Sequence, residues 1–179
     1  MNIGFDLDGI FVHLPPILPA WVIERLYRER NQTQLHYRIP GEIEKRIRIL
    51  SHASLLRPPI KENILFAKNL SHSKKYTFFL VSSRFGFLKQ QTEKIIRKYG
   101  IDKIFHKIYF NYDNEQPHIF KDRIIKKMKI SLFIDDDIYL LTYLAKENPT
   151  TQFFWLNTST NKKIANNLSA ITNISSMTP

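Results

Sequence analysis

Five short runs of apolar and β-branched residues recur along the chain and constrain its fold more than any other feature. They occupy residues 3–5, 76–81, 107–110, 130–134 and 152–156. Most of them are almost continuously apolar rather than alternating, which is typical of parallel strands covered by helices on both faces. The pattern therefore predicts one sheet of about five strands.

Segments with helical periodicity separate the later runs. Residues 88–99 carry apolar side chains at helical spacing and are followed by Gly100, a common residue just past a helix end. Residues 119–128 and 139–147 have the same character. Strand and helix thus alternate, which predicts an α/β fold with a doubly wound parallel sheet. A length of 179 residues suits one such core with an insertion.

The stretch between the first two apolar runs is far longer than an ordinary crossover connection. Its apolar residues predict two amphipathic helices, and a third helix is expected at residues 61–70, after two prolines. The residues that mark the first two helices are Leu18, Trp21, Val22 and Leu26, and then Ile43, Ile47, Leu50 and Leu55. We interpret residues 13–71 as a small helical cap with a connecting helix, inserted into a core formed by residues 1–12 and 72–179. The alternative is a set of ordinary helices packed on one face of the sheet. The polar segment 157–179 is expected to hold one helix and to fray beyond it.

Composition limits the classes of partner and chemistry. Lysine and arginine number 27 against 16 aspartate and glutamate residues, a formal charge of +11. This excess favours anionic ligands, nucleic acid or an acidic surface, although a solvated basic surface would look the same and no nucleic-acid-binding motif accompanies it. The absence of cysteine excludes disulfides, thiolate catalysis and cysteine-bound zinc. We expect a cytoplasmic protein without a signal peptide, whose apolar runs are too short to span a membrane.

Polar residues follow three of the predicted strands, at the edge of a parallel sheet where ligands bind. The three groups are Asp6, Asp8 and Gly9; Ser82, Ser83 and Arg84; and Asp135, Asp136 and Asp137. Carboxylates gathered at two strand ends would repel one another in a partly buried cleft, and a divalent cation would remove that repulsion. Magnesium fits best, because it takes a few carboxylates and keeps water and phosphate as further ligands.

With a metal present, each group gains a role in phosphate chemistry. Of Asp6 and Asp8, one can attack and the other can move protons, while Gly9 allows a tight turn. Ser82 and the backbone N–H groups of its turn can bind phosphate oxygens. Lys121, near the start of the helix before the fourth strand, can neutralise the group being transferred.

These four features, in this order, resemble the four motifs of the haloacid dehalogenase (HAD) superfamily. The resemblance implies a Rossmann-like core in which Asp6 is the nucleophile and Asp8 the general acid and base. It implies that Asp6, the backbone carbonyl of Asp8 and Asp135 hold Mg²⁺, with Asp136 as a ligand or support. Ser82 and Lys121 would bind the phosphoryl oxygens, and Ser83 and Arg84 are also expected to bind the substrate phosphate. The insertion resembles the helical cap called C1, and the order of parts is similar to the deoxyribonucleotidase-like (5′-nucleotidase) branch.

Two departures from the family pattern stand out. Ile10 lies where threonine or valine is commoner. The triple acidic run leaves open whether Asp135 and Asp136 or Asp136 and Asp137 form the working pair. We favour the first pair because Ile134 closes the apolar run.

Several other residues admit two interpretations. His13 could face substrate or be a packing or surface residue. Arg84 could touch substrate or pair with an acidic neighbour. Trp21, Tyr27 and Tyr37 could stack on a nucleotide base or form the core of the cap.

The leading hypothesis is a magnesium-dependent phosphatase that acts on a small phosphorylated metabolite or a nucleotide. A second hypothesis keeps the same site and gives it a polynucleotide end or a phosphoprotein. A third is a non-catalytic binding module that retains the fold.

Overall fold

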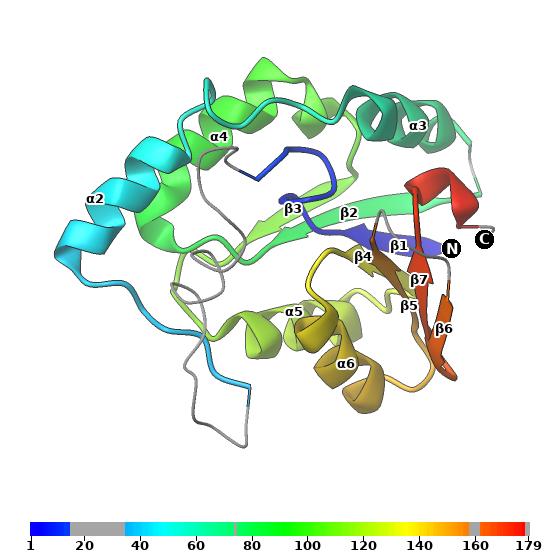
Figure 1. Cartoon of the computed structure of the whole chain (residues 1–179). Coiled ribbons are helices and arrows are strands. Elements are labelled where there is room, and N and C mark those ends of the chain that lie inside the picture. The colour runs from blue at the N-terminus through cyan, green and yellow to red at the C-terminus, as the bar shows by residue number, and fades with distance from the viewer. Residues whose placement is uncertain (15–34, 74, 158–161, 178–179) are drawn as a thin grey trace.

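A seven-stranded sheet forms the centre of the molecule (Figure 1), a computed structural model that describes residues 1–14, 35–73, 75–157 and 162–177. The strand order is β3-β2-β1-β4-β5-β7-β6, and every neighbouring pair is parallel except β6 and β7. The strands are β1 (Asn2–Phe5), β2 (Thr77–Ser82), β3 (Lys107–Phe110), β4 (Leu132–Asp135), β5 (Gln152–Leu156), β6 (Lys162–Ala165) and β7 (Leu168–Ile171). The predicted α/β fold with a mostly parallel sheet is confirmed, with seven strands instead of about five.

Helices cover both faces of this sheet (Figure 1). Helices α3 (Lys61–Ser71) and α4 (Lys89–Lys98) lie on one face, and α5 (Pro117–Lys127) and α6 (Ile138–Glu147) on the other. Along β2, Phe78 and Leu80 join the apolar cluster under α3 and α4, while Phe79 and Val81 join the one under α5 and α6. Burial on both faces explains why the strands read as continuous apolar runs.

The C-terminal segment departs from the prediction of a single helix. It forms a hairpin of β6 and β7, followed by the short 3₁₀ helix η3 (Ile174–Ser176). Strand β7 extends the parallel sheet beside β5 and buries Leu168 and Ile171, while β6 closes the sheet with an irregular register between Lys163 and Ala165. The prediction was wrong because the few apolar residues of β7 that pack on the sheet stand among polar residues, so the sequence shows no clear strand pattern there.

The insertion between β1 and β2 contains α2 (Glu42–Ser51) as well as α3, both where helices were predicted. The helix predicted around Leu18 to Leu26 lies outside the described residues. Helix α2 differs from the prediction in its orientation, because Ile43 and Leu50 on its apolar side are 79% and 69% exposed, whereas Arg48 is buried. None of the described helices combines the length and apolarity needed to cross a bilayer.

Candidate active site

The polar residues that follow β1, β2 and β4 are brought together by strand pairing. Phe5 at the end of β1 pairs with Leu80 of β2 on one side and with Ile134 of β4 on the other. The backbone N–H of Asp6 donates to the carbonyl of Ile134 at 2.9 Å, which fixes Asp6 beside Asp135. The register of the sheet therefore determines which carboxylates meet.

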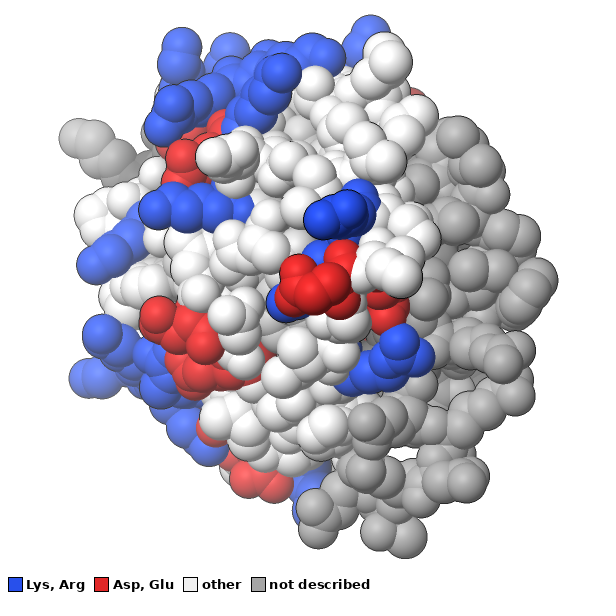
Figure 2. Space-filling view, turned by 90° about the vertical axis from the view of Figure 1, so that its left-hand side faces the viewer, with Lys and Arg blue, Asp and Glu red and all other residues white. Residues whose placement is uncertain are grey.

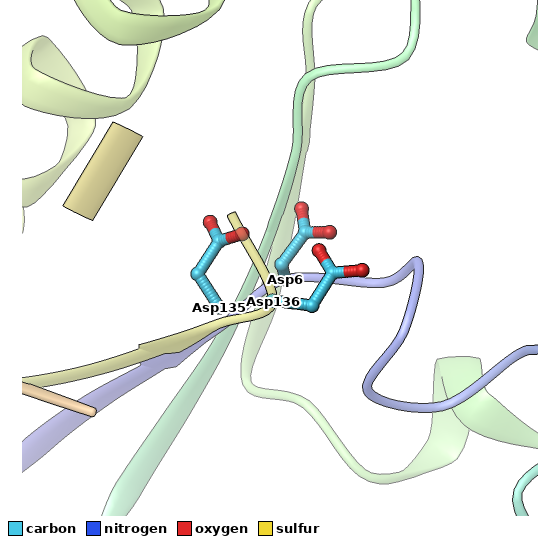
Figure 3. Close-up of side chains that lie close together, drawn as sticks. All are labelled: Asp6, Asp135 and Asp136. Atoms are coloured by element: carbon cyan, nitrogen blue, oxygen red, sulfur yellow. The ribbon is translucent and has the colours of Figure 1, made fainter. Parts of the chain in front are cut away.

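Three of these carboxylates form a compact acidic cluster. One oxygen from each of Asp6, Asp135 and Asp136 lies within 4.8 Å of the others, and the three side chains point to the same side of the strand ends (Figure 3). From α5, the buried Lys121 donates through Nζ to Asp6 Oδ1 at 2.7 Å and to Asp135 Oδ2 at 2.6 Å. The arrangement brings four residues predicted from the sequence into one site.

Negative charge in this cluster exceeds what Lys121 can balance. Burial raises the pKa of Asp6 to about 7, with Lys121 opposing the rise and Asp135 and Asp8 adding to it. Burial, reinforced by Asp135 and Asp6, raises the pKa of Asp136 well above its usual range. Burial would lower the pKa of Lys121, but Asp135 and Asp6 raise it, so this lysine stays charged. A further cation would stabilise the ionised cluster.

The cluster fits a divalent cation that prefers oxygen ligands. Asp136 supplies the clearest sign, because its carboxylate accepts no hydrogen bond from any residue in the described ranges. Ionised carboxylates in partly buried sites normally have donors or a metal. Asp6, Asp135 and Asp136 could together hold Mg²⁺, leaving its other positions to water and phosphate.

Gly9 lets the loop after Asp6 lie directly against Asp136. Its φ of +70° favours glycine, and a Cβ atom added there would lie 2.2 Å from Asp136 Oδ2. In the same turn, the backbone N–H of Asp8 donates to Asp6 Oδ2 at 3.0 Å. Both contacts require the tight turn that Gly9 was predicted to allow.

The side chain of Asp8 is held apart from the acidic cluster by two buried arginines. Arg84 donates through Nε to Asp8 Oδ2 and through Nη2 to Oδ1, each at 2.7 Å, and Arg57 Nη1 donates to Oδ1 at 2.9 Å. Burial would raise the pKa of Asp8, but Arg84 and Arg57 hold it well below its usual range. Of the two interpretations of Arg84, the ion pair with an acidic neighbour is therefore the arrangement present.

The two serines lie at the exit of β2. Ser82 is buried, and its Oγ accepts from the backbone N–H of Arg84 at 3.5 Å. Ser83 is partly exposed. No hydrogen bond links either serine to the acidic cluster within the described part of the chain, so their role toward phosphate stays a prediction.

Asp137 has a different task from its two neighbours. It precedes α6, where Oδ1 accepts from the backbone N–H groups of Tyr139 at 3.0 Å and Leu140 at 3.2 Å. Its Oδ2 accepts from the Tyr37 hydroxyl at 2.8 Å. These contacts make Asp137 the N-cap of the helix, and the geometry favours Asp135 and Asp136 as the working pair.

The remaining sequence candidates are distributed outside the cluster. Tyr37 is buried and stacks on the ring of His118, with 6.2 Å between the ring centroids. His13 is exposed. Trp21 and Tyr27 lie outside the described residues.

Two buried residues near Asp8 were not anticipated from the sequence. Arg57 and His52 both lie in the insertion, and Arg57 is 49 positions from Asp8 along the chain. No motif marks either of them, since contact between distant segments leaves no periodic signal. Only the charge of Arg57 hinted at an acidic partner.

Comparison with known proteins identifies the fold. No family model and no curated protein sequence matches the chain significantly. Among solved structures, it is similar to a HAD-superfamily hydrolase from Ehrlichia chaffeensis, with a TM-score of 0.55 and 13% identity over 97% of this chain and 92% of that one. It is also similar to a HAD-family enzyme from Bacteroides thetaiotaomicron solved with magnesium and inorganic phosphate, with a TM-score of 0.56 and 15% identity over 89% and 95% of the two chains.

A further similarity is to a chain of the Pnkp1/Rnl/Hen1 RNA repair complex, with a TM-score of 0.56 and 15% identity. That match covers 87% of the present chain but only 42% of the longer one. The present chain thus spans less than half the length of the RNA repair chain. The order of strands, the position of the acidic cluster and these similarities lead to one conclusion: the chain has the fold of the HAD-superfamily hydrolases.

Proposed function

We propose that the protein is a magnesium-dependent phosphohydrolase that cleaves phosphomonoesters through an aspartyl-phosphate on Asp6. The observation that carries the proposal is the buried cluster in which Asp6, Asp135 and Asp136 share one site with Lys121. A nucleophilic carboxylate, a fixed positive charge and a set of metal ligands are what phosphoryl transfer requires in one place. The similarity to HAD-family hydrolases supports the same chemistry.

In the proposed first step, an oxygen of Asp6 attacks phosphorus and the ester P–O bond breaks. The leaving oxygen takes a proton from Asp8. In the second step, water attacks phosphorus, gives a proton to Asp8, and the bond between phosphorus and Asp6 breaks. Bound Mg²⁺ would supply Lewis-acid stabilisation of the phosphoryl oxygens, held by Asp6, Asp135, Asp136 and the backbone carbonyl of Asp8.

The ion pairs of Asp8 bear on these two steps differently. With Arg84 and Arg57 bound to it, Asp8 is ionised and suited to accept a proton from water. To donate a proton to the leaving group, Asp8 must first acquire one, so substrate binding has to loosen at least one of the two pairs. Lys121 keeps its charge throughout and neutralises the group being transferred.

We propose that the substrate is a small phosphorylated metabolite. The specific form of this proposal is a nucleotide, which would make the protein a 5′-nucleotidase. We also propose that residues 13–71 form a cap that sets specificity. Tyr37 supports the role of the insertion as a cap, because the hydrogen bond from Tyr37 to Asp137 brings the insertion to the acidic end of the sheet. Ser82, Ser83 and Lys121 are the proposed phosphate-binding residues.

The test is phosphate release from a panel of nucleotides, sugar phosphates and alkyl phosphates, with and without Mg²⁺. We expect release that requires Mg²⁺ and is lost in Asp6→Asn, a variant that removes the nucleophile but keeps the shape of the side chain. No release from any ester by a folded protein that binds Mg²⁺ would favour the non-catalytic binding module. Release that persists in Asp6→Asn would contradict the role given to Asp6.

A polynucleotide end is the second candidate substrate. The net charge of +11 and the similarity to a chain of an RNA repair complex favour it. Figure 2 shows several groups of basic side chains, with acidic ones between them, on the side toward which the strand ends point. Oligonucleotides with a terminal phosphate should then release phosphate faster than mononucleotides do, and this difference in rate should fall steeply as the salt concentration rises.

A further inference from the structure

Arg57 approaches Asp8 from the insertion rather than from the sheet. It lies between α2 and α3 and is only 2% exposed. Its Nη1 donates to Asp8 Oδ1 at 2.9 Å and to the carbonyl of His13 at 3.4 Å, and its Nε donates to the carbonyl of Ser51 at 3.2 Å. The third nitrogen, Nη2, lies 2.8 Å from Nε2 of His52. Every nitrogen of the guanidinium is therefore fixed by a partner.

His52 can accept from Arg57 in only one protonation state. The ring is buried, and its Nδ1 lies 2.7 Å from the carbonyl of Arg48. Because a carbonyl only accepts, Nδ1 carries the hydrogen. Nε2 is then the bare nitrogen that accepts from Arg57, and the imidazole is neutral. Burial lowers the pKa of His52, and the nearby Arg84 and Arg57 lower it further, which favours the same neutral state.

The backbone around Arg57 is attached to the core at several points. The Tyr99 hydroxyl, just after α4, donates to the carbonyls of Ser54 at 2.8 Å and Arg57 at 3.0 Å. On the other side, the N–H of His13 donates to the carbonyl of Pro58 at 2.9 Å. Because His13 follows the turn that carries Asp8, this contact ties Arg57 to the same loop as its acidic partner.

We propose that Arg57, held in place by His52, is a positioning residue that orients the carboxylate of Asp8 for proton transfer. The inference rests on the proposed function. Arg84 already contacts both oxygens of Asp8, and Arg57 adds a third bond to Oδ1 from a separate segment. Rotation of the carboxylate would break bonds to both arginines. The insertion thereby contributes to the chemistry as well as to any cap it forms.

The experiment compares two variants of His52. His52→Leu removes the acceptor for Arg57, whereas His52→Gln keeps an acceptor oxygen at the same reach. Arg57→Lys retains the charge but cannot contact Asp8 and His52 together. Arg97→Met serves as a matched control, because Arg97 is exposed and lies on α4. Melting temperatures show which variants are folded.

The readout is kcat/KM with glycerol 2-phosphate and with p-nitrophenyl phosphate, because this parameter covers steps up to the first phosphoryl transfer. Nitrophenolate leaves without a proton, whereas an alkoxide needs one from Asp8. We expect His52→Leu and Arg57→Lys to lower kcat/KM for the alkyl ester by roughly 10- to 100-fold, and for the aryl ester by less than about 3-fold. His52→Gln and Arg97→Met should keep the wild-type ratio between the two substrates.

If the role of these residues were only structural, kcat/KM would fall by the same factor for both substrates. An unchanged ratio in His52→Leu and Arg57→Lys therefore overturns the inference, and if Arg57→Lys does not fold, the two His52 variants decide. Failure of the proposed function is distinct, because the wild-type protein would then release phosphate from neither ester. That result would overturn both proposals, whereas an active wild type with an unchanged ratio overturns this one alone.

Discussion

Lys121 and Asp135 form a fully buried ion pair, with 2.6 Å between Nζ and Oδ2. The same nitrogen contacts Asp6, so Lys121 is the one described cation that separates these two carboxylates. Removing one partner of a buried pair leaves an uncompensated charge, which destabilises a protein by about 3–5 kcal/mol.

Replacing this lysine should therefore lower stability in a way that depends on pH. We expect Lys121→Met to lose about 3–5 kcal/mol of the free energy of unfolding at pH 8 without Mg²⁺. The loss should shrink toward pH 5, because burial raises the pKa of Asp6 and Asp135 and their protonation removes the uncompensated negative charge. Urea denaturation at the two pH values measures both effects. Lys126→Met, which breaks an exposed pair with Asp122 on the same helix, should change stability by less than about 1 kcal/mol; an equal loss in both variants would contradict this account.

Replacing Gly9 by alanine should damage the metal site more than it damages the fold. The added Cβ would lie 2.2 Å from Asp136 Oδ2, and the φ of +70° would add backbone strain. We expect the affinity for Mg²⁺, measured by titration calorimetry, to fall by at least about tenfold. Gly100→Ala is the matched control, because its φ is +66° but open space surrounds its Cβ position. If the two variants bind Mg²⁺ equally, the contact with Asp136 is unimportant.

Two neighbouring aspartates should respond differently to substitution. Asp136→Asn should weaken Mg²⁺ binding, since its carboxylate lies in the acidic cluster. Asp137→Ala should instead lower stability by about 0.5–2 kcal/mol through the lost N-cap and leave the affinity for Mg²⁺ close to wild type. Calorimetry and thermal unfolding of both variants separate the effects. Weaker Mg²⁺ binding in both variants would instead make Asp136 and Asp137 the working pair.

His52 should make stability depend on pH between 7 and 5. Burial, with Arg84 and Arg57 nearby, keeps the pKa of His52 in the folded protein well below 6.5, although Asp8 opposes this. Below pH 6.5 the unfolded chain therefore binds a proton at this residue that the folded protein does not, and the free energy of unfolding falls as pH falls.

The expected slope is up to about 1.4 kcal/mol for each pH unit below 6.5. Because glutamine does not titrate, His52→Gln should lose less stability than wild type from pH 7 to pH 5 in urea denaturation. The exposed His72 offers a control, and His72→Gln should follow the wild-type profile. A His52→Gln profile parallel to wild type would show that His52 titrates normally in the folded protein.

The parts of the fold that follow from local patterns could be predicted from the sequence. Continuous apolar runs identified the parallel strands, and the carboxylates directly after them, such as Asp6 and Asp135, were expected at one edge of the sheet. Strand β7 was missed because its buried side chains, Leu168, Ala170 and Ile171, form a short and weakly apolar run among polar residues. The contact of Arg57 with Asp8 was also missed, since it joins segments whose meeting depends on the whole path of the insertion.

The same limit explains the orientation of α2. Its periodicity predicted a helix correctly, but periodicity alone does not determine which face of the helix packs against the rest of the protein. Arg48 is buried and pairs with Glu44 on the same helix, whereas Ile43 is exposed.

The two outermost strands also bear on how the protein behaves at high concentration. Strands β3 and β6 are only four residues long, each carries an exposed lysine at Lys107 or Lys163, and β6 is irregular beside Ala165. Short, charged and irregular borders are poor templates for hydrogen bonding to a strand of another molecule. The sheet can therefore remain open at both sides with little tendency to pair with a strand of a second molecule.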